Sequence, residues 1–315
     1  MWTKQFSELS KDHADIAGGK GASLGELTQS GIPVPPGFVV TAQSFKHFVE
    51  ETGLEEKIDT VLKTVNIEKT STVDEASKKI QDLIMAQDVL MPQDIQTEIE
   101  ENFTKLDAPF VAVRSSATAE DSAAAAWAGQ LDTYLNTTKE TLLENVRRCW
   151  ASLFTPRAIF YRFEKELDQT DIAVAVVIQK MVASDASGVA FSVDPVTENA
   201  THILIEGAYG LGEAVVSGTI TPDAFVVQKE SGEILEKNIA EQEKGLYRKE
   251  GGDCEWREIS SDKSASQKIS DEQLKQLADI IVRIEKHYGS PQDIEWALEG
   301  EDLYIVQSRP ITTLT

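Results

Sequence analysis

Glycines surround a lysine near the start of the chain. Residues 18–21 read Gly-Gly-Lys-Gly and lie just ahead of a stretch with helical character. Glycine lets a backbone approach an anion closely, a helix N-terminus offers unpaired amides, and Lys20 adds a mobile positive charge. The segment is not a Walker A sequence, because the Gly-Lys-Ser/Thr ending is missing. A phosphate-binding loop and a flexible turn with a solvated lysine explain it about equally well.

A second basic segment follows a predicted buried strand at residues 109–113. The strand leads into Arg114, which is followed by two serines and, after an alanine, a threonine. A guanidinium can bind phosphate oxygens through two parallel hydrogen bonds, and hydroxyl groups add donors. The next loop, residues 119–128, is rich in small side chains and leads to Gly129 and Thr133, so it could fold over a ligand. An ion pair between the arginine and an acidic residue of this loop is an equally good interpretation.

The most informative residues lie near the C-terminus. Glu295 and Gln307 fall on two predicted strands, residues 293–298 and 303–307, which a short turn joins. Cross-strand proximity in an antiparallel pair would bring the two side chains together, and their oxygens suit Mg²⁺. Arg309 follows two positions later on the same face and could neutralise a phosphate. For an arbitrary hairpin, a solvated polar face is the more frequent outcome.

Composition narrows the classes of function. The 315 residues have a formal net charge of −23, with 41% hydrophobic and 26% charged residues, which is ordinary for a globular protein. The negative charge disfavours binding to nucleic acid, and no apolar run is long enough for a membrane helix. Two cysteines and no recognisable secretion signal fit a reducing compartment. We therefore expect a cytoplasmic protein without nucleic-acid or membrane partners.

Three segments with different patterns follow one another. Residues 1–108 are predicted to be mainly helical, residues 109–200 to hold central strands and the covering loop, and residues 201–315 to form a C-terminal lobe with the strand pair. The clearest helix signal lies in this last segment. Ser270 and Gln273 form a predicted capping box, and the helix that they begin should stop near Gly289.

In order along the chain, these motifs resemble the nucleotide-binding part shared by phosphoenolpyruvate synthase, pyruvate phosphate dikinase and rifampicin phosphotransferase. The match covers the chain from about residue 5 to residue 312. It rests on residues 18–27, 31–38, 113–121, 128–130, 293–296 and 305–310. The resemblance implies an α+β protein with an ATP-grasp fold, in which two lobes hold ATP between them.

The resemblance also implies roles for residues in the first two segments. Lys20 and Arg114 would bind the ATP phosphates. Gly129 and Thr133 would belong to the loop that covers the phosphates. Gln179, at the end of a predicted central strand, would lie near the adenine.

The C-terminal residues take the remaining roles that the resemblance implies. Glu295 and Gln307 would contact Mg²⁺ and the nucleotide, and Asp293 would be a further metal ligand. Arg309 would contact the terminal phosphates. Lys20, Arg114 and Arg309 together would be the catalytic residues.

Members of this family pass a phosphoryl group from ATP to a histidine on a separate swivelling domain. This chain lacks the Thr-Ser-His motif of that domain and also the phosphoenolpyruvate/pyruvate domain, so we expect an isolated nucleotide-binding domain. The domain of an antibiotic kinase of the rifampicin type, or a non-catalytic nucleotide-binding module, are the alternatives. One departure from the family pattern is an alanine run at residues 123–126, where relatives usually have a polar loop.

Overall fold

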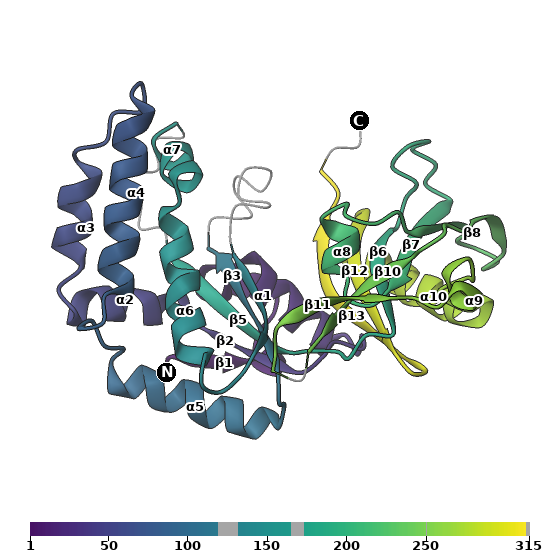
Figure 1. The fold of residues 1–315 in the computed structure, drawn as a ribbon, viewed down its shortest axis with the longest axis horizontal. Coiled ribbons are helices and arrows are strands. Elements are labelled where there is room, and N and C mark those ends of the chain that lie inside the picture. The colour runs from purple at the N-terminus through teal and green to yellow at the C-terminus, as the bar shows by residue number, and fades with distance from the viewer. Residues whose placement is uncertain (119–131, 165–172, 250, 313–315) are drawn as a thin grey trace. The chain divides into compact units, whose positions relative to one another are not determined.

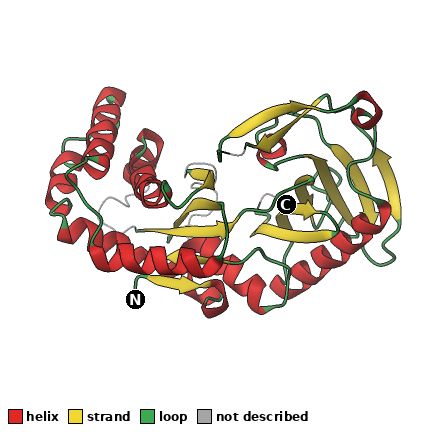
Figure 2. Cartoon of the chain, turned by 60° about the horizontal axis from the view of Figure 1, so that its bottom comes forward, coloured by secondary structure: helices red, strands yellow, loops and turns green. Residues whose placement is uncertain are grey.

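The computed structural model describes residues 1–118, 132–164, 173–249 and 251–312. Its contacts group the chain into two compact units. Unit 1 comprises residues 1–26 and 36–181, and unit 2 comprises residues 27–35 and 182–315. Figure 2 shows helices and strands along the chain. Both units contain both kinds of element, so the α+β class expected from the sequence is confirmed. The division into two units differs from the three segments that the sequence suggests.

Unit 1 is built on a five-stranded antiparallel sheet in the order β1-β2-β5-β3-β4. The strands are β1 (Thr3–Gln5), β2 (Gly37–Val40), β3 (Val111–Ala117), β4 (Thr133–Thr137) and β5 (Val174–Lys180). Every residue of the central strand β5 except the last is buried. Its run of β-branched residues therefore fits a strand that is covered on both faces.

Helices make up most of the rest of unit 1. They are α1 (Ala14–Gln29), whose last residues belong to unit 2, α2 (Ala42–Glu51), α3 (Glu55–Leu62), α4 (Thr70–Met85), α5 (Gln93–Leu106), α6 (Leu142–Ala151) and α7 (Pro156–Glu164). Helix α4 contacts α3, α6 and α7, which lie around it in Figure 1. Its buried residues Val73, Ala76, Ile80 and Ile84 recur every three or four positions, so they form one apolar stripe.

Unit 2 contains a six-stranded antiparallel sheet in the order β13-β12-β6-β7-β8-β9. The strands are β6 (Ala186–Phe191), β7 (His202–Tyr209), β8 (Asp223–Gln228), β9 (Ile234–Asn238), β12 (Gln292–Glu299) and β13 (Asp302–Pro310). A separate hairpin, β10 (Lys244–Arg248) and β11 (Cys254–Glu258), and the short helices α8 (Glu213–Val216) and α9 (Ser261–Ser264) complete the unit.

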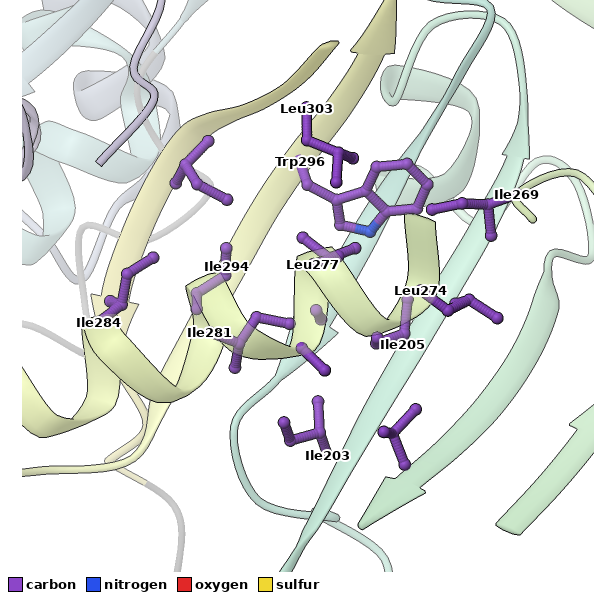
Figure 3. Close-up of a cluster of buried hydrophobic side chains, with 14 of the residues drawn as sticks. Ile203, Ile205, Ile269, Leu274, Leu277, Ile281, Ile284, Ile294, Trp296 and Leu303 are labelled. Carbon is purple, nitrogen blue, oxygen red and sulfur yellow. The ribbon is translucent and has the colours of Figure 1, made fainter. Parts of the chain in front are cut away.

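Helix α10 (Asp271–Tyr288) covers one face of this sheet. Ser270 and Gln273 form the capping box, and Gly289 ends the helix in a left-handed conformation, so the sequence prediction for this helix is confirmed. Figure 3 shows side chains of α10 meeting those of the strands, with Trp296 among them. The face that packs on α10 is called the core face below, and the opposite face is called the outer face.

Candidate nucleotide-binding site

The glycine cluster of unit 1 is held against strand β3. Gly18 has φ +67°, and a Cβ there would lie 2.4 Å from the carbonyl oxygen of Ser116, so only glycine fits. The Gly21 amide donates a hydrogen bond to the Ser116 hydroxyl at 3.3 Å. Lys20 therefore lies in the first turn after the kink at Gly18, next to the strand that carries Arg114.

The buried thiol of Cys149 on α6 lies next to β3 and is affected by the charge of Lys20. Cys149 is buried, and its thiol lies 3.7 Å from the carbonyl oxygen of Val113. Burial raises the pKa of this thiol to about 12, while the positive charge of Lys20 acts in the opposite direction. The thiol is therefore protonated at neutral pH and is a poor nucleophile.

Three predicted site residues of unit 1 share one face of its sheet. Arg114 is buried and pairs with Thr133 on β4 and with Val177 on β5. Gln179 lies two residues after Val177, and side chains two positions apart on a strand point to the same face. Gly21 packs against Val177, so helix α1 begins over this same face. The structure thus brings Lys20, Arg114, Thr133 and Gln179 to one side of the sheet.

Gln179 bears the most direct sign of a binding role. Its side chain is 3% exposed, and among the described residues its Nε2 group has no hydrogen-bond partner. An unpaired buried amide costs about 1–3 kcal/mol, unless a ligand supplies an acceptor. A ring nitrogen of adenine is an acceptor of this kind, so the residue fits its predicted place near the base.

The hydroxyl groups around Arg114 have other partners. Ser115 donates to the carbonyl oxygen of Asp132 at 3.1 Å, and Thr118 donates to that of Ala173 at 3.0 Å. These hydroxyls hold the end of β3 in place, so we do not count them among the phosphate donors that the sequence suggested. Gly129 lies outside the described residues, as does the alanine run at 123–126.

In unit 2, the structure brings the C-terminal site residues together. Glu295 pairs directly with Gln307, and Asp293 pairs directly with Arg309, in the antiparallel ladder of β12 and β13. Residues that face each other in such a ladder share one face, and so do residues two apart. All four therefore lie on the outer face. The cross-strand proximity that the sequence predicted is confirmed.

A β-bulge produces this arrangement. The register shifts after Glu295, so that Trp296 pairs with Ile305 and Val306 is the extra residue of β13. Without it, strict alternation from the buried Ile305 would direct Gln307 toward the core face. The bulge re-aims Gln307 to the outer face beside Glu295.

An ion pair holds Arg309 in position. Its Nε and Nη2 atoms lie 2.8 Å and 2.7 Å from the same carboxylate oxygen of Asp293. The side chain of Arg309 is 53% exposed, whereas that of Asp293 is 16% exposed. Asp293 thus orients an accessible guanidinium, a role that its predicted function as a metal ligand did not include.

The donor set of unit 2 fits a magnesium–nucleotide complex. Carboxylate and amide oxygens are hard ligands, and Mg²⁺ bound to a nucleotide needs only one or two protein ligands beside phosphate and water. Within the described ranges, no group of three or more His, Cys, Asp or Glu side chains could hold a metal ion by itself. A metal at Glu295 and Gln307 would thus depend on oxygens from the nucleotide.

Comparison with known proteins identifies the family. Residues 14–315 match the family model described as the AMP/ATP-binding domain of pyruvate phosphate dikinase. The chain belongs to this family. The match therefore spans unit 1 from residue 14 onward, all of unit 2 and all the site residues described above.

Curated relatives of this AMP/ATP-binding domain are longer proteins. Probable phosphoenolpyruvate synthases of Methanocaldococcus jannaschii and Methanothermobacter thermautotrophicus are each 48% identical to it over 98% of the chain. The chain spans 26% and 46% of these two proteins, respectively. A rifampicin phosphotransferase of Bacillus cereus is 42% identical over 98% of the chain, which spans 36% of that protein. In the part of the chain that the structure describes, no helix is long and apolar enough to cross a membrane.

Sequence reasoning passed over one carboxylate on the outer face. Glu206 on β7 pairs with Val189 on β6, and Val189 pairs with Glu295, so the three side chains point the same way. No local motif marks Glu206. Only the strand order and register reveal its place.

Replacing Gly18 with alanine should disrupt the attachment of the glycine cluster. The new Cβ would collide with the backbone of Ser116, and the backbone strain alone costs about 1–3 kcal/mol. We expect a lower unfolding free energy in urea denaturation and weaker nucleotide binding through displacement of Lys20. Gly31→Ala is the matched control, because Gly31 has φ +69° but nothing within 4 Å of its Cβ position. Equal losses in both variants would contradict the role of the Ser116 contact.

Proposed function

We propose that this domain binds Mg-ATP and donates a phosphoryl group to a histidine on a separate swivelling domain, as part of a phosphoenolpyruvate synthase-like enzyme. The observation that carries the proposal is the outer-face set of Glu295, Gln307 and Arg309, two oxygen ligands beside a positioned cation. Membership of the AMP/ATP-binding family and the two similar probable phosphoenolpyruvate synthases support it. ATP-grasp architecture, with one nucleotide contacted by both units, is part of the proposal.

The proposed roles of the site residues follow from the charges and ligand atoms of their side chains. Lys20, Arg114 and Arg309 would bind the phosphates and neutralise the charge that develops during transfer. Glu295 and Gln307 would hold Mg²⁺, which when bound withdraws charge from the phosphate oxygens. The second partner domain, for phosphoenolpyruvate and pyruvate, would complete the overall reaction. For a full enzyme, the resemblance implies that the β-phosphoryl group is transferred, that AMP is released, and that water takes the γ-phosphoryl group as inorganic phosphate.

Replacing Arg114 with alanine should weaken Mg-ATP binding by about 10-fold to 150-fold. This range corresponds to about 1.5–3 kcal/mol for hydrogen bonds to a charged group. Isothermal titration calorimetry of the wild-type domain and the variant measures the change. Arg148→Ala is the matched control, since Arg148 is an exposed arginine paired with Glu144. Unchanged affinity in the Arg114 variant, or no binding by the wild type, would contradict the proposal.

Phosphoryl transfer needs its own experiment. The domain is mixed with the histidine-bearing region of a phosphoenolpyruvate synthase relative and with ATP labelled in the β-position. We expect the wild-type domain to transfer the label to the histidine. The Glu295→Ala variant should not transfer it. The second acceptor to test is the histidine-bearing region of a rifampicin phosphotransferase, because one such relative is 42% identical to this chain. Transfer to that acceptor alone would favour an antibiotic kinase, and binding without any transfer would favour a non-catalytic module.

A further inference from the structure

The outer face of the unit 2 sheet carries a further carboxylate, Glu206, besides the predicted magnesium ligands. Across strands β13, β12, β6 and β7, the register places Gln307, Glu295, Val189 and Glu206 in one row. Neighbouring strands are about 4.8 Å apart, so Glu206 lies about 10 Å from Glu295 along the sheet. Below the row, on the core face, the Trp296 indole packs against Gly207.

Glu206 has an unusual environment for an acidic side chain. It is partly buried, and its directly opposed neighbours are the apolar residues Val189 and Ala224. Among the described residues, it forms no hydrogen bond or ion pair through its carboxylate. Burial raises the pKa of the Glu206 carboxyl above its ordinary value. A charged group kept in such a place without a partner is a candidate for ligand binding.

We propose that the Glu206 carboxylate accepts hydrogen bonds from the sugar hydroxyl groups of the bound nucleotide and thereby selects ribonucleotides over deoxyribonucleotides. This inference rests on the proposed function, because it assumes that the magnesium-bound phosphates lie at Glu295 and Gln307. It adds a residue that determines specificity, and neither the motifs nor the family match assigns it.

The chemistry of the row favours hydroxyl groups over other partners. A negative carboxylate repels phosphate, so the phosphates belong at the other end of the row, near Arg309. The apolar neighbours Val189 and Ala224 provide no metal ligands, which disfavours a second cation. About 10 Å separates Glu206 from Glu295, so the part of the nucleotide that it meets lies well beyond the metal-bound phosphates. Sugar hydroxyls are donors in that part of the molecule.

The test compares the affinities for ATP, 2′-deoxy-ATP and 3′-deoxy-ATP by calorimetry in the presence of Mg²⁺. The wild-type domain should bind ATP at least about 10-fold more tightly than one of the deoxy nucleotides, as a hydrogen bond to a charged group predicts. Glu206→Ala should remove this preference, whereas Glu206→Gln should retain part of it. Glu236→Gln is the control, because Glu236 is an exposed glutamate on β9 of the same sheet.

The outcomes separate this inference from the proposed function. Equal affinities of the wild type for ATP and both deoxy nucleotides would overturn the role of Glu206 and leave Mg-ATP binding standing. Full preference for ATP in Glu206→Ala would also overturn it. No binding of ATP by the wild type would overturn both proposals. A loss of preference in Glu236→Gln equal to that in Glu206→Ala would show that the effect is not local, and would overturn the assignment.

Stability without ligand gives a second measurement. Because the folded pKa of Glu206 is raised, the folded state binds its proton more tightly, and this carboxyl lowers stability as pH rises through and above its ordinary range. Glu206→Gln should therefore unfold at a higher temperature than the wild type near neutral pH. The difference should vanish at acid pH, where the carboxyl is protonated in both states. A less stable variant at neutral pH would indicate a structural role and overturn the inference.

Discussion

Replacing Asp223 with alanine should lower the free energy of unfolding of unit 2 by about 3–5 kcal/mol, the range for breaking one partner of a buried ion pair. The side chains of Asp223 and Lys268 are both 0% exposed, and their charged atoms are 2.9 Å apart. Asp223 also accepts hydrogen bonds from the backbone amides of Ala240 and Lys268. Its removal thus leaves two backbone amides without this acceptor. The buried ammonium of Lys268 loses its counter-charge and keeps the carbonyl oxygens of Ala240 and Ser264 as acceptors.

Urea denaturation of three variants tests this expectation. Glu255→Ala is the control, because its ion pair with Arg257 is exposed and should contribute much less. The double variant Asp223→Leu with Lys268→Met should recover part of the loss, since it removes both charges together. A loss for Asp223→Ala no greater than for Glu255→Ala would contradict the prediction.

Replacing Trp296 with alanine should cost about 3–5 kcal/mol, as expected for a large aromatic side chain in a packed core. Trp296 is 1% exposed, and its indole N–H donates to the carbonyl oxygen of Val189 at 3.3 Å. A Cβ added at Gly207 would lie 2.7 Å from the indole, so the ring fills the space that this glycine leaves. The cavity could not close without moving β6 and β7.

The exposed Trp256 offers a matched control for this variant. Its side chain is 42% exposed on the β11 strand, where Lys244 lies 4.8 Å from the ring centroid. Trp256→Ala should therefore change the unfolding free energy far less. Similar urea midpoints for the two variants would show that Trp296 is not a principal core residue. Mg-ATP binding by the Trp296→Ala variant can be measured at a temperature at which the variant is folded. Loss of binding would show that the packing of Trp296 on the core face supports the site on the outer face.

Local signals in the sequence predict much of the secondary structure. The helix that begins after Ser270 was predicted because its caps are encoded within a few residues. The strand pair with Glu295 and Gln307 was predicted for a similar reason, since a turn of a few residues joins the two strands. Both features depend on short-range contacts, which a single sequence can reveal.

Long-range features could not be predicted in this way. The neighbours of β12 are its hairpin partner β13 and the distant strand β6, so the row from Glu295 to Glu206 depends on pairing that no local pattern encodes. The Asp223–Lys268 pair joins residues 45 positions apart. Residue types and spacing marked Lys20, Arg114, Glu295, Gln307 and Arg309 as candidates, and the family resemblance supplied their individual roles. The structure brings these residues together within each unit through shared faces and direct pairing.

The extra residue Val306 divides strand β13 into two halves with different constraints. Before it, Leu303 and Ile305 belong to the apolar core, whereas after it Gln307 and Arg309 face away from that core. Substitutions at Arg309, whose side chain is 53% exposed, can therefore change the charge of the outer face without repacking the interior. Ser308 in the same half is buried and donates to Gln292, so it remains part of the interior. Deletion of Val306 would restore regular alternation along β13. Gln307 and its neighbours would then exchange faces of the sheet, so polar side chains would point toward the core. One inserted residue thus lets a single strand contribute apolar side chains to the interior at one end and polar side chains to the opposite face at the other.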